Sequence, residues 1–231
     1  MKVQNLKVLG IIPARKGSKG IPNKNFIKIN NRKRLIDYTL LEAKKSRLLS
    51  KIVLTTDDDR IINHSKKYKL DFVIKRKKKY STDYVKSVDV VLDVLKKIKN
   101  YKADLIMLLQ PTSPLRKSRH IDESIRLFCN QYKKFNSLVS VTLLEEPHPF
   151  KLKKIQNKFL VPFLKNTNSE IPRQQLDKVY KLNGSIYLIK KNILEYKKSF
   201  FDKTMPYIMD EKYSLNIDTI NDLKFFKKIN I

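Results

Sequence analysis

The chain of 231 residues is organised around the stretch Ile11-Ile12-Pro13-Ala14-Arg15-Lys16-Gly17-Ser18-Lys19-Gly20-Ile21-Pro22-Asn23-Lys24-Asn25. The apolar run over residues 8–12 predicts a buried strand that leads directly into a loop. Two of the four glycines, Gly17 and Gly20, lie in this loop, and glycine permits positive φ and close approach of backbone N–H groups to an anion. Four basic side chains surround them, those of Arg15, Lys16, Lys19 and Lys24. The stretch therefore predicts a binding loop for a triphosphate.

The spacing of this loop differs from two widespread phosphate-binding motifs. Gly17 and Gly20 are too close together for the G-x-x-x-x-G-K-[ST] pattern, and the loop does not match the G-x-G-x-x-G dinucleotide pattern. An exposed basic turn after an edge strand is the alternative interpretation of the same residues.

Length and composition predict one domain, residues 1–231, with 41% hydrophobic residues available for a core. No run approaches the roughly 18–20 apolar residues of a membrane span, and residues 1–7 lack the apolar segment of a signal peptide. Cys129 is the single cysteine, which indicates a reducing compartment. We therefore expect a cytoplasmic protein that does not associate with a membrane.

The formal net charge of +29 raises the question of nucleic-acid binding, because Lys and Arg neutralise phosphates. The lysines are spread along the whole chain rather than gathered in one arm, and the densest run, residues 75–79, is typical of a solvated loop. We expect no specific nucleic-acid partner.

Apolar patterns alternate between strand and helix along the chain. Strands are predicted at residues 8–12, 51–55, 71–74, 104–109, 137–143 and 213–219, with a further strand from Asn183, and helices at 35–46, 60–68, 85–98, 121–132 and 221–229. This order predicts an α/β fold, Rossmann-like, with a mostly parallel sheet and helices on both faces. Ligands of such sheets collect beyond the carboxyl ends of the strands, where the polar motifs of this chain fall.

The central loop resembles the N-terminal signature of the acylneuraminate cytidylyltransferases, the CMP-sialic acid synthetase family. The resemblance continues in Gln110-Pro111-Thr112-Ser113-Pro114-Leu115-Arg116, in Arg173-Gln174-Gln175-Leu176 and in Leu182-Asn183-Gly184-Ser185-Ile186-Tyr187. It implies the nucleotide-diphospho-sugar transferase type of fold. It also implies that CTP activates a nine-carbon 2-keto-3-deoxy acidic sugar, such as sialic acid, legionaminate or pseudaminate, with release of pyrophosphate.

The resemblance implies a set of site residues. Catalytic roles are expected for Arg15, Lys24 and Asp218. CTP binding is expected of Ala14, Arg15, Gly17, Ser18, Lys19, Gly20, Lys24, Asn25, Arg76, Ser81 and Asp83. Sugar binding is expected of Gln110, Arg173 and Asn183, because an arginine fork can hold the sugar carboxylate in two hydrogen bonds.

Each of these assignments has a structural alternative. Gln110 can serve a rigid turn, in which Ser113 and Arg116 are expected to shape the backbone. Arg76 and Asp83 can belong to a solvated loop, whose path differs from the family because Lys77 replaces its usual proline. Arg173 can form an interfacial salt bridge.

Asn216 and Asp218 are the expected metal ligands. The family usually has two aspartates here that bind Mg²⁺, whereas this chain has Asn216 in the first position. Magnesium often relies on one or two carboxylates and on substrate phosphates, so Asp218 can suffice with weaker binding. A cap on the last helix is the alternative role for Asp218.

Residues 145–177 lose simple periodicity and carry four prolines, and such a long segment is expected to have a function of its own. In the resembling family this region is a small excursion that makes a homodimer. Three other functions stay open: a cytidylyltransferase for an eight-carbon ulosonic acid of lipopolysaccharide, a nucleotidyltransferase for sugar 1-phosphates, and a catalytically impaired, basic RNA-associated protein.

Overall fold

A computed structural model describes residues 6–18 and 20–229, so Lys19 lies outside the described residues. Its centre is a seven-stranded sheet with the order β3-β2-β1-β4-β8-β5-β9. The strands are β1 (Val8–Pro13), β2 (Lys51–Thr56), β3 (Phe72–Lys75), β4 (Leu105–Leu108), β5 (Ser137–Leu143), β8 (Tyr180–Lys190) and β9 (Thr204–Ile208). Only β8 runs antiparallel to its neighbours β4 and β5 within this sheet. The expected mostly parallel α/β fold is confirmed.

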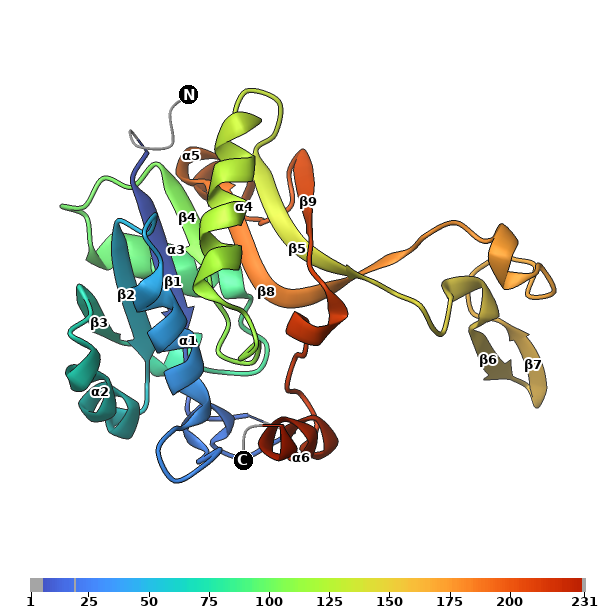
Figure 1. Ribbon diagram of the computed structural model, residues 1–231, viewed down its shortest axis with the longest axis horizontal. Helices are drawn as coiled ribbons and strands as arrows, with labels where there is room; N and C mark the ends of the chain where they lie inside the picture. The colour runs from blue at the N-terminus through green and yellow to red at the C-terminus, as the bar shows by residue number, and fades with distance from the viewer. Residues whose placement is uncertain (1–5, 19, 230–231) are drawn as a thin grey trace.

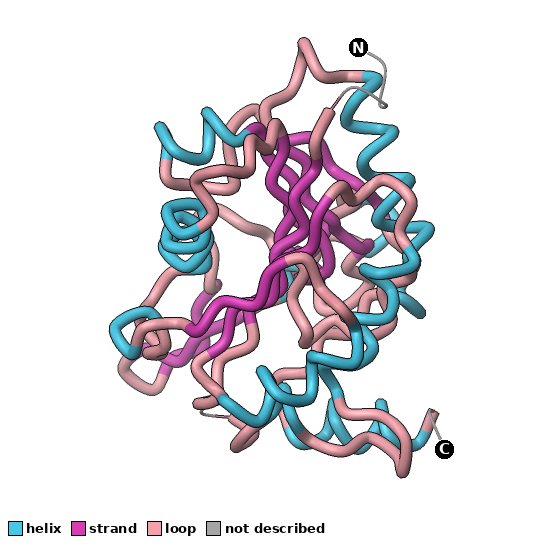
Figure 2. The backbone as a smooth tube through the Cα atoms, turned by 90° about the vertical axis from the view of Figure 1, so that its left-hand side faces the viewer, coloured by secondary structure: helices cyan, strands magenta, loops and turns pink. Residues whose placement is uncertain are grey.

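Helices cover both faces of the sheet, as Figure 2 shows. They are α1 (Leu35–Lys45), α2 (Asp59–Ser65), α3 (Ser87–Lys97), α4 (Ser118–Asn130), α5 (Lys191–Lys197) and α6 (Ile220–Lys228). The apolar residues of α1, α2 and α4 pack on one face and those of α3 and α5 pack on the other.

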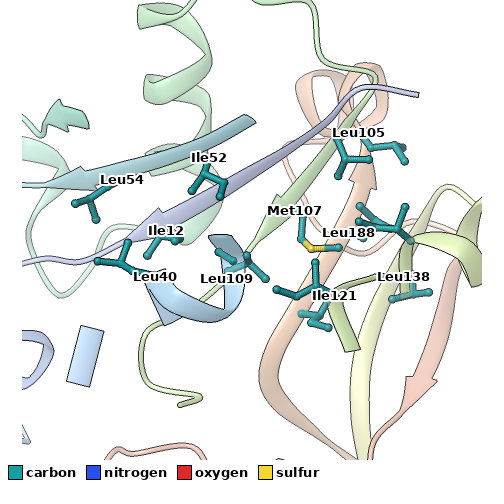
Figure 3. Close-up of a cluster of buried hydrophobic side chains, with 14 of the residues drawn as sticks. Ile12, Leu40, Ile52, Leu54, Leu105, Met107, Leu109, Ile121, Leu138 and Leu188 are labelled. Atoms are coloured by element: carbon teal, nitrogen blue, oxygen red, sulfur yellow. The ribbon is translucent and has the colours of Figure 1, made fainter. Parts of the chain in front are cut away.

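The central strands read as continuous apolar runs because each face of the sheet has its own core. In β4, Leu105 and Met107 join the cluster beneath α1 and α4, whereas Ile106 and Leu108 join the cluster beneath α3. Figure 3 shows the first cluster, in which Met107 lies between Leu105 and Leu109 of the same strand region and near Ile121 of α4. Burial on both faces is the reason that period-two alternation is absent from these strands.

A third cluster brings the end of the chain beneath the central loop. Ile217, Leu223 and Phe226 pack with Ile21 and Leu35. Figure 1 accordingly places α6 beside the loop that follows β1, at the end of the sheet where the parallel strands terminate. This packing positions residues 216–218 against the phosphate-binding candidate loop.

Two parts of the secondary structure differ from the sequence prediction. The strand expected at residues 213–219 is wrong: a 3-10 turn, Glu211–Tyr213, is followed by extended chain that belongs to no strand. Its Ile217 N–H donates to the carbonyl oxygen of Thr112 (2.8 Å), so the segment is held by the turn after β4. Helix α5 and strand β9 lie where no element was expected.

The excursion over residues 145–177 carries a small hairpin, β6 (Lys153–Gln156) and β7 (Phe159–Pro162), between β5 and β8. Figure 1 shows it standing well away from the main sheet. Its large apolar side chains are exposed, with Ile155 at 80% and Phe159 at 72%. Among the described residues, no helix combines the length and apolar character that a membrane crossing requires.

Candidate active site

A cavity of about 530 Å³ opens at the carboxyl ends of β1, β3 and β4. Five segments line it: the loop after β1, the segment after β3, the first turn of α3, the turn after β4, and residues 216–218. The lining residues are Pro13, Arg15, Ser18, Gly20, Lys24, Asn25, Arg76, Tyr80, Thr82, Asp83, Val85, Ser87, Val90, Gln110, Pro111, Thr112, Asn216 and Asp218.

Hydrogen bonds to neighbouring strands hold the loop after β1 in place. The Ala14 N–H donates to Thr55 O (2.9 Å), and the Lys16 N–H donates to the Asp57 carboxylate (2.8 Å). The buried Asn25 donates its amide N–H to Arg15 O (2.9 Å), while its Oδ1 has no hydrogen-bond partner among the described residues. Asn25 thus fixes the loop and keeps one acceptor in the cavity wall.

The two loop glycines serve different purposes, and the φ of Gly17 is not positive. A Cβ on Gly20 would lie 2.7 Å from the carbonyl oxygen of Asp218, whereas a Cβ on Gly17 would meet nothing within 4 Å. A positive φ is thus not the reason for glycine at position 17. Gly20 is required by close packing, because the backbones of the loop and of Asp218 touch there.

Arg15 and Asp83 form an ion pair across the cavity at 2.5 Å, each with about a third of its side chain exposed. Arg76 lies deeper, where its Nη2 donates to Thr55 O (2.8 Å) and its Nε has no partner among the described residues. Burial lowers the pKa of Arg76 to about 10, so the guanidinium stays charged at neutral pH. A buried cation with an unused donor is a suitable contact for an anionic or carbonyl-rich ligand.

Lys24, Asn216 and Asp218 meet at one edge of the cavity. The Lys24 ammonium donates to Asp218 Oδ1 (2.9 Å) and to Ile217 O (2.7 Å). The Asn216 amide N–H donates to the other oxygen of Asp218. Three residues expected in the catalytic or metal-binding sets thus lie together, and their roles stay predictions.

The alternative role of Asp218 as a helix cap is wrong. Helix α6 begins after Thr219, whose hydroxyl accepts the N–H of Asp222, and the Asp222 carboxylate accepts the N–H of Thr219 in return. The Asp218 carboxylate instead faces Lys24 and the cavity.

The donor set at this edge fits a magnesium ion. Asp218 supplies a carboxylate that is 63% exposed, and the Oδ1 of Asn216 is buried without a partner among the described residues. Magnesium prefers such oxygen ligands and normally completes its octahedron with phosphate oxygens and water.

Gln110 is held at the cavity by the turn that follows β4. The fully buried Arg116 donates to Gln110 O (3.2 Å), Ser185 O (2.7 Å) and Thr39 Oγ1 (2.8 Å). Burial lowers the pKa of Arg116 to about 9. These contacts confirm that Arg116 shapes the turn, because both terminal nitrogens of its guanidinium are bonded there, and only its Nε has no partner among the described residues.

Gln110 also lines a neighbouring cavity of about 400 Å³ on the side of α3 and β8. The other residues of that cavity are Lys86, Ser87, Val88, Leu108, Tyr187, Lys198, Ser199, Phe200 and Phe201. The two cavities share Ser87 and Gln110, so a ligand that bridges them would pass beside this amide.

Asn183 is buried and its amide is engaged within the protein. Its Oδ1 accepts from Ser140 Oγ (2.6 Å) and from the Ser185 N–H (3.1 Å), and its Nδ2 donates to Ser214 Oγ (3.0 Å). It lines a third cavity of about 740 Å³ near α6 rather than the first one. The geometry gives Asn183 a holding role between β5 and the chain that leads to Asp218, and its contact with sugar stays a prediction.

Arg173 lies in the excursion, away from the cavity of its own chain. Its guanidinium pairs with Glu146 (2.7 Å) and lies 3.9 Å from Glu145. It lines a separate cavity at the base of the excursion. Sugar binding by Arg173 stays a prediction that requires a second copy of the chain.

Only some of the remaining residues that were expected to bind CTP line the cavity. Ser18 lines the cavity, but Ala14, Gly17 and Ser81 do not, and Lys19 lies outside the described residues. The Ala14 N–H is already bonded, so a contact to CTP would need another part of that residue. The lining residues that the sequence prediction missed are Pro13, Tyr80, Thr82, Val85, Ser87, Val90, Pro111 and Thr112. Pro13, at the end of β1, and Pro111 and Thr112, in the turn after β4, could have been found from their position at strand ends. The others lie farther along the chain or in α3, where that signal does not reach.

Comparison with known proteins gives a consistent result. A family model described as Cytidylyltransferase matches residues 9–230. The N-acylneuraminate cytidylyltransferase of Escherichia coli O18:K1:H7 is 32% identical over 94% of this chain, and the chain spans 51% of that protein. The chain thus spans about half the length of the N-acylneuraminate cytidylyltransferases it matches.

Two further proteins match along nearly their whole length. The CMP-N,N'-diacetyllegionaminic acid synthase of Legionella pneumophila is 31% identical, with 97% of this chain and 96% of that protein covered. The solved structure of a CMP:2-keto-3-deoxy-manno-octonic acid synthetase complexed with CTP has a TM-score of 0.71 at 16% identity, covering 97% and 98% of the two chains. At that identity the likeness concerns the fold.

Proposed function

The chain belongs to the cytidylyltransferase family, and we propose that it joins the cytidylyl group of CTP to a nine-carbon acidic sugar and releases pyrophosphate. Relatives at 31% identity that it spans almost completely are named for legionaminic and pseudaminic acids. The observation that carries the proposal is the single cavity that gathers the cations of Arg15, Lys24 and Arg76 beside the amide of Gln110.

The three cations serve the triphosphate and the base. Arg15 and Lys24 project from the loop after β1 and would neutralise phosphate oxygens, with Ser18 and the backbone around Gly20 completing the cradle. Arg76 would use its free Nε–H on the cytosine side of the nucleotide. Asp83 pairs with Arg15, and a phosphate of CTP would replace that contact.

The sugar would lie beyond Gln110, in the neighbouring cavity that shares this residue. The reaction forms a bond from the 2-hydroxyl oxygen of the sugar to the α-phosphorus and breaks the bond from that phosphorus to pyrophosphate. The residues of the cavity contribute by aligning the two substrates and by neutralising charge on the departing phosphates. Water or a phosphate oxygen is left to take the proton, since no histidine lines the described cavity.

Asp218, through its exposed carboxylate, and Asn216, through its Oδ1, are the residues that would hold magnesium. When bound, the ion supplies charge neutralisation to the triphosphate.

We infer that the enzyme acts as a homodimer in which the excursion of one copy completes the cavity of the other. Ile155, Phe159 and Leu160 are all exposed on this hairpin, and exposed apolar patches of this kind mark interaction surfaces. Arg173 on the same excursion would then reach the sugar carboxylate of the second copy. A single buried cysteine and a nucleotide substrate fit a cytoplasmic enzyme.

The decisive experiment measures pyrophosphate release from CTP and magnesium with a panel of acidic sugars. N-acetylneuraminate, legionaminate and pseudaminate form one arm, an eight-carbon ulosonic acid the second, and sugar 1-phosphates the third. Arg15→Ala and Lys24→Ala should each abolish most of the turnover while the protein stays folded. If the wild type releases pyrophosphate with none of the acids, or if both variants release it at the wild-type rate, the proposed function is contradicted. RNA binding without turnover would favour the RNA-associated alternative.

A further inference from the structure

Lys24 joins two parts of the site that are far apart in the sequence. Its ammonium contacts Asp218 Oδ1 at 2.9 Å and Ile217 O at 2.7 Å, and its side chain is 12% exposed. The other carboxylate oxygen of Asp218 accepts the amide N–H of Asn216. Both oxygens of the candidate metal-binding carboxylate therefore already have N–H donors.

The Asp218 carboxylate is already paired with a cation of the chain itself, the Lys24 ammonium. Asn216 is neutral where a second carboxylate would add negative charge. The nearby Asp222 carboxylate accepts the N–H of Asp218 and also interacts with the Lys24 charge, which holds the ammonium more firmly at this edge. A magnesium ion must approach a ligand oxygen to about 2.0–2.1 Å, which places two like charges around the same carboxylate. Their repulsion scales with the product of the charges, and the tethered ammonium has the advantage of high effective concentration.

We propose that Lys24 is the resident cation of the free site: its ammonium occupies Asp218 until the triphosphate draws it away, and the metal position opens only then. The inference rests on the proposed function, because CTP is the triphosphate that competes for Lys24. Lys24 thus has two partners, one after the other: Asp218 before the nucleotide binds, and a phosphate afterwards. Asn216, unlike an aspartate, adds no further negative charge beside Asp218.

The contact of Gly20 with Asp218 limits the movement to the Lys24 side chain when its ammonium changes partner. Because the Gly20 backbone packs directly on the carbonyl of Asp218, the loop and the 216–218 segment stay together when the ammonium changes partner. Lys24 itself begins a short 3-10 turn, Lys24–Phe26, whose Asn25 is anchored to Arg15 O, so the backbone is fixed and the side chain is the part that moves.

The test is a titration of the nucleotide-free protein with Mn²⁺, in which the electron paramagnetic resonance signal of the free ion measures how much Mn²⁺ is bound. Lys24→Met and Lys24→Gln should each bind Mn²⁺ on the order of tenfold more tightly than the wild type. Asp218→Asn placed in the Lys24→Met background should remove the gain. Lys16→Met is the matched control, since it takes one exposed positive charge from the same loop without touching Asp218.

Circular dichroism and thermal melting establish that each variant is folded, and Lys24→Gln keeps an uncharged N–H donor at this position if Lys24→Met unfolds. An equal gain in Lys16→Met, or no gain in either Lys24 variant, overturns the proposal. Wild-type protein that binds Mn²⁺ as tightly as the Lys24 variants overturns it as well. These titrations contain no CTP and no sugar, so they remain informative if the proposed reaction is wrong.

Discussion

Replacing Gly20 with alanine tests whether the packing between the loop and Asp218 is needed for catalysis. A Cβ on Gly20 starts 2.7 Å from the Asp218 carbonyl oxygen, and carbon–oxygen contacts settle at about 3.3–3.6 Å. The two backbones must therefore separate by roughly 0.6–0.9 Å. Lys24 and Asp218, which meet across this contact, are displaced with them.

We expect two separate consequences. Overpacking lowers the free energy of unfolding by about 1–3 kcal/mol, measured by urea denaturation. Displacement of catalytic groups by most of an ångström lowers kcat/KM for CTP by about 10–100-fold, measured by pyrophosphate release at saturating sugar and magnesium.

Gly17→Ala is the matched control from the same loop. Its Cβ would meet no atom within 4 Å and its backbone is not left-handed, so its unfolding free energy should be unchanged or higher by up to about 1 kcal/mol. If Gly20→Ala is as active and as stable as Gly17→Ala, the contact with Asp218 is not tight in solution and the reasoning fails.

Asp218→Asn should abolish turnover, whereas Asn216→Asp should lower the magnesium concentration that gives the half-maximal rate. Initial rates measured against free magnesium at saturating CTP test both expectations, and an active Asp218→Asn protein would show that the metal binds elsewhere. Deletion of residues 145–177 should give a soluble, inactive monomer by light scattering, and a wild type that is active as a monomer at nanomolar concentration contradicts the dimer. Arg173→Ala should raise the KM for sugar more than that for CTP, and equal effects on both would remove Arg173 from the sugar site. Arg116→Met should cost about 1–3 kcal/mol of unfolding free energy, because buried acceptors lose their donor, and an unchanged urea midpoint would show that the turn does not depend on it.

Local patterns in the sequence were sufficient for the central part of the fold. Apolar runs predict the strands β1, β2 and β4, and amphipathic stripes predict the helices α1, α3 and α4. Both patterns are visible in the sequence because burial of one or both faces of an element requires apolar residues there. Parallel order then places the loops after these strands at one edge, so the sequence by itself predicts that Arg15, Arg76 and Gln110 share one cavity.

The pattern was misleading where an element has no partner strand. Leu215 and Ile217 alternate with polar residues as in a half-buried strand, yet they pack with α6 and the loop instead of joining a sheet. A periodicity of two describes any extended chain with one buried side, whether or not neighbouring backbone is available for pairing.

The tertiary structure alone decided how the site is joined together. The contact of Gly20 with Asp218 and the pairing of Lys24 with the same residue span nearly the whole chain, and no local propensity records a contact between residues so distant. The use of Asn183 as an internal brace and of Arg116 as a buried support likewise depends on which acceptors the folded chain places around them. Residue type and spacing predicted which groups reach the carboxyl edge of the sheet, but the partner of each group is set by packing across the whole fold.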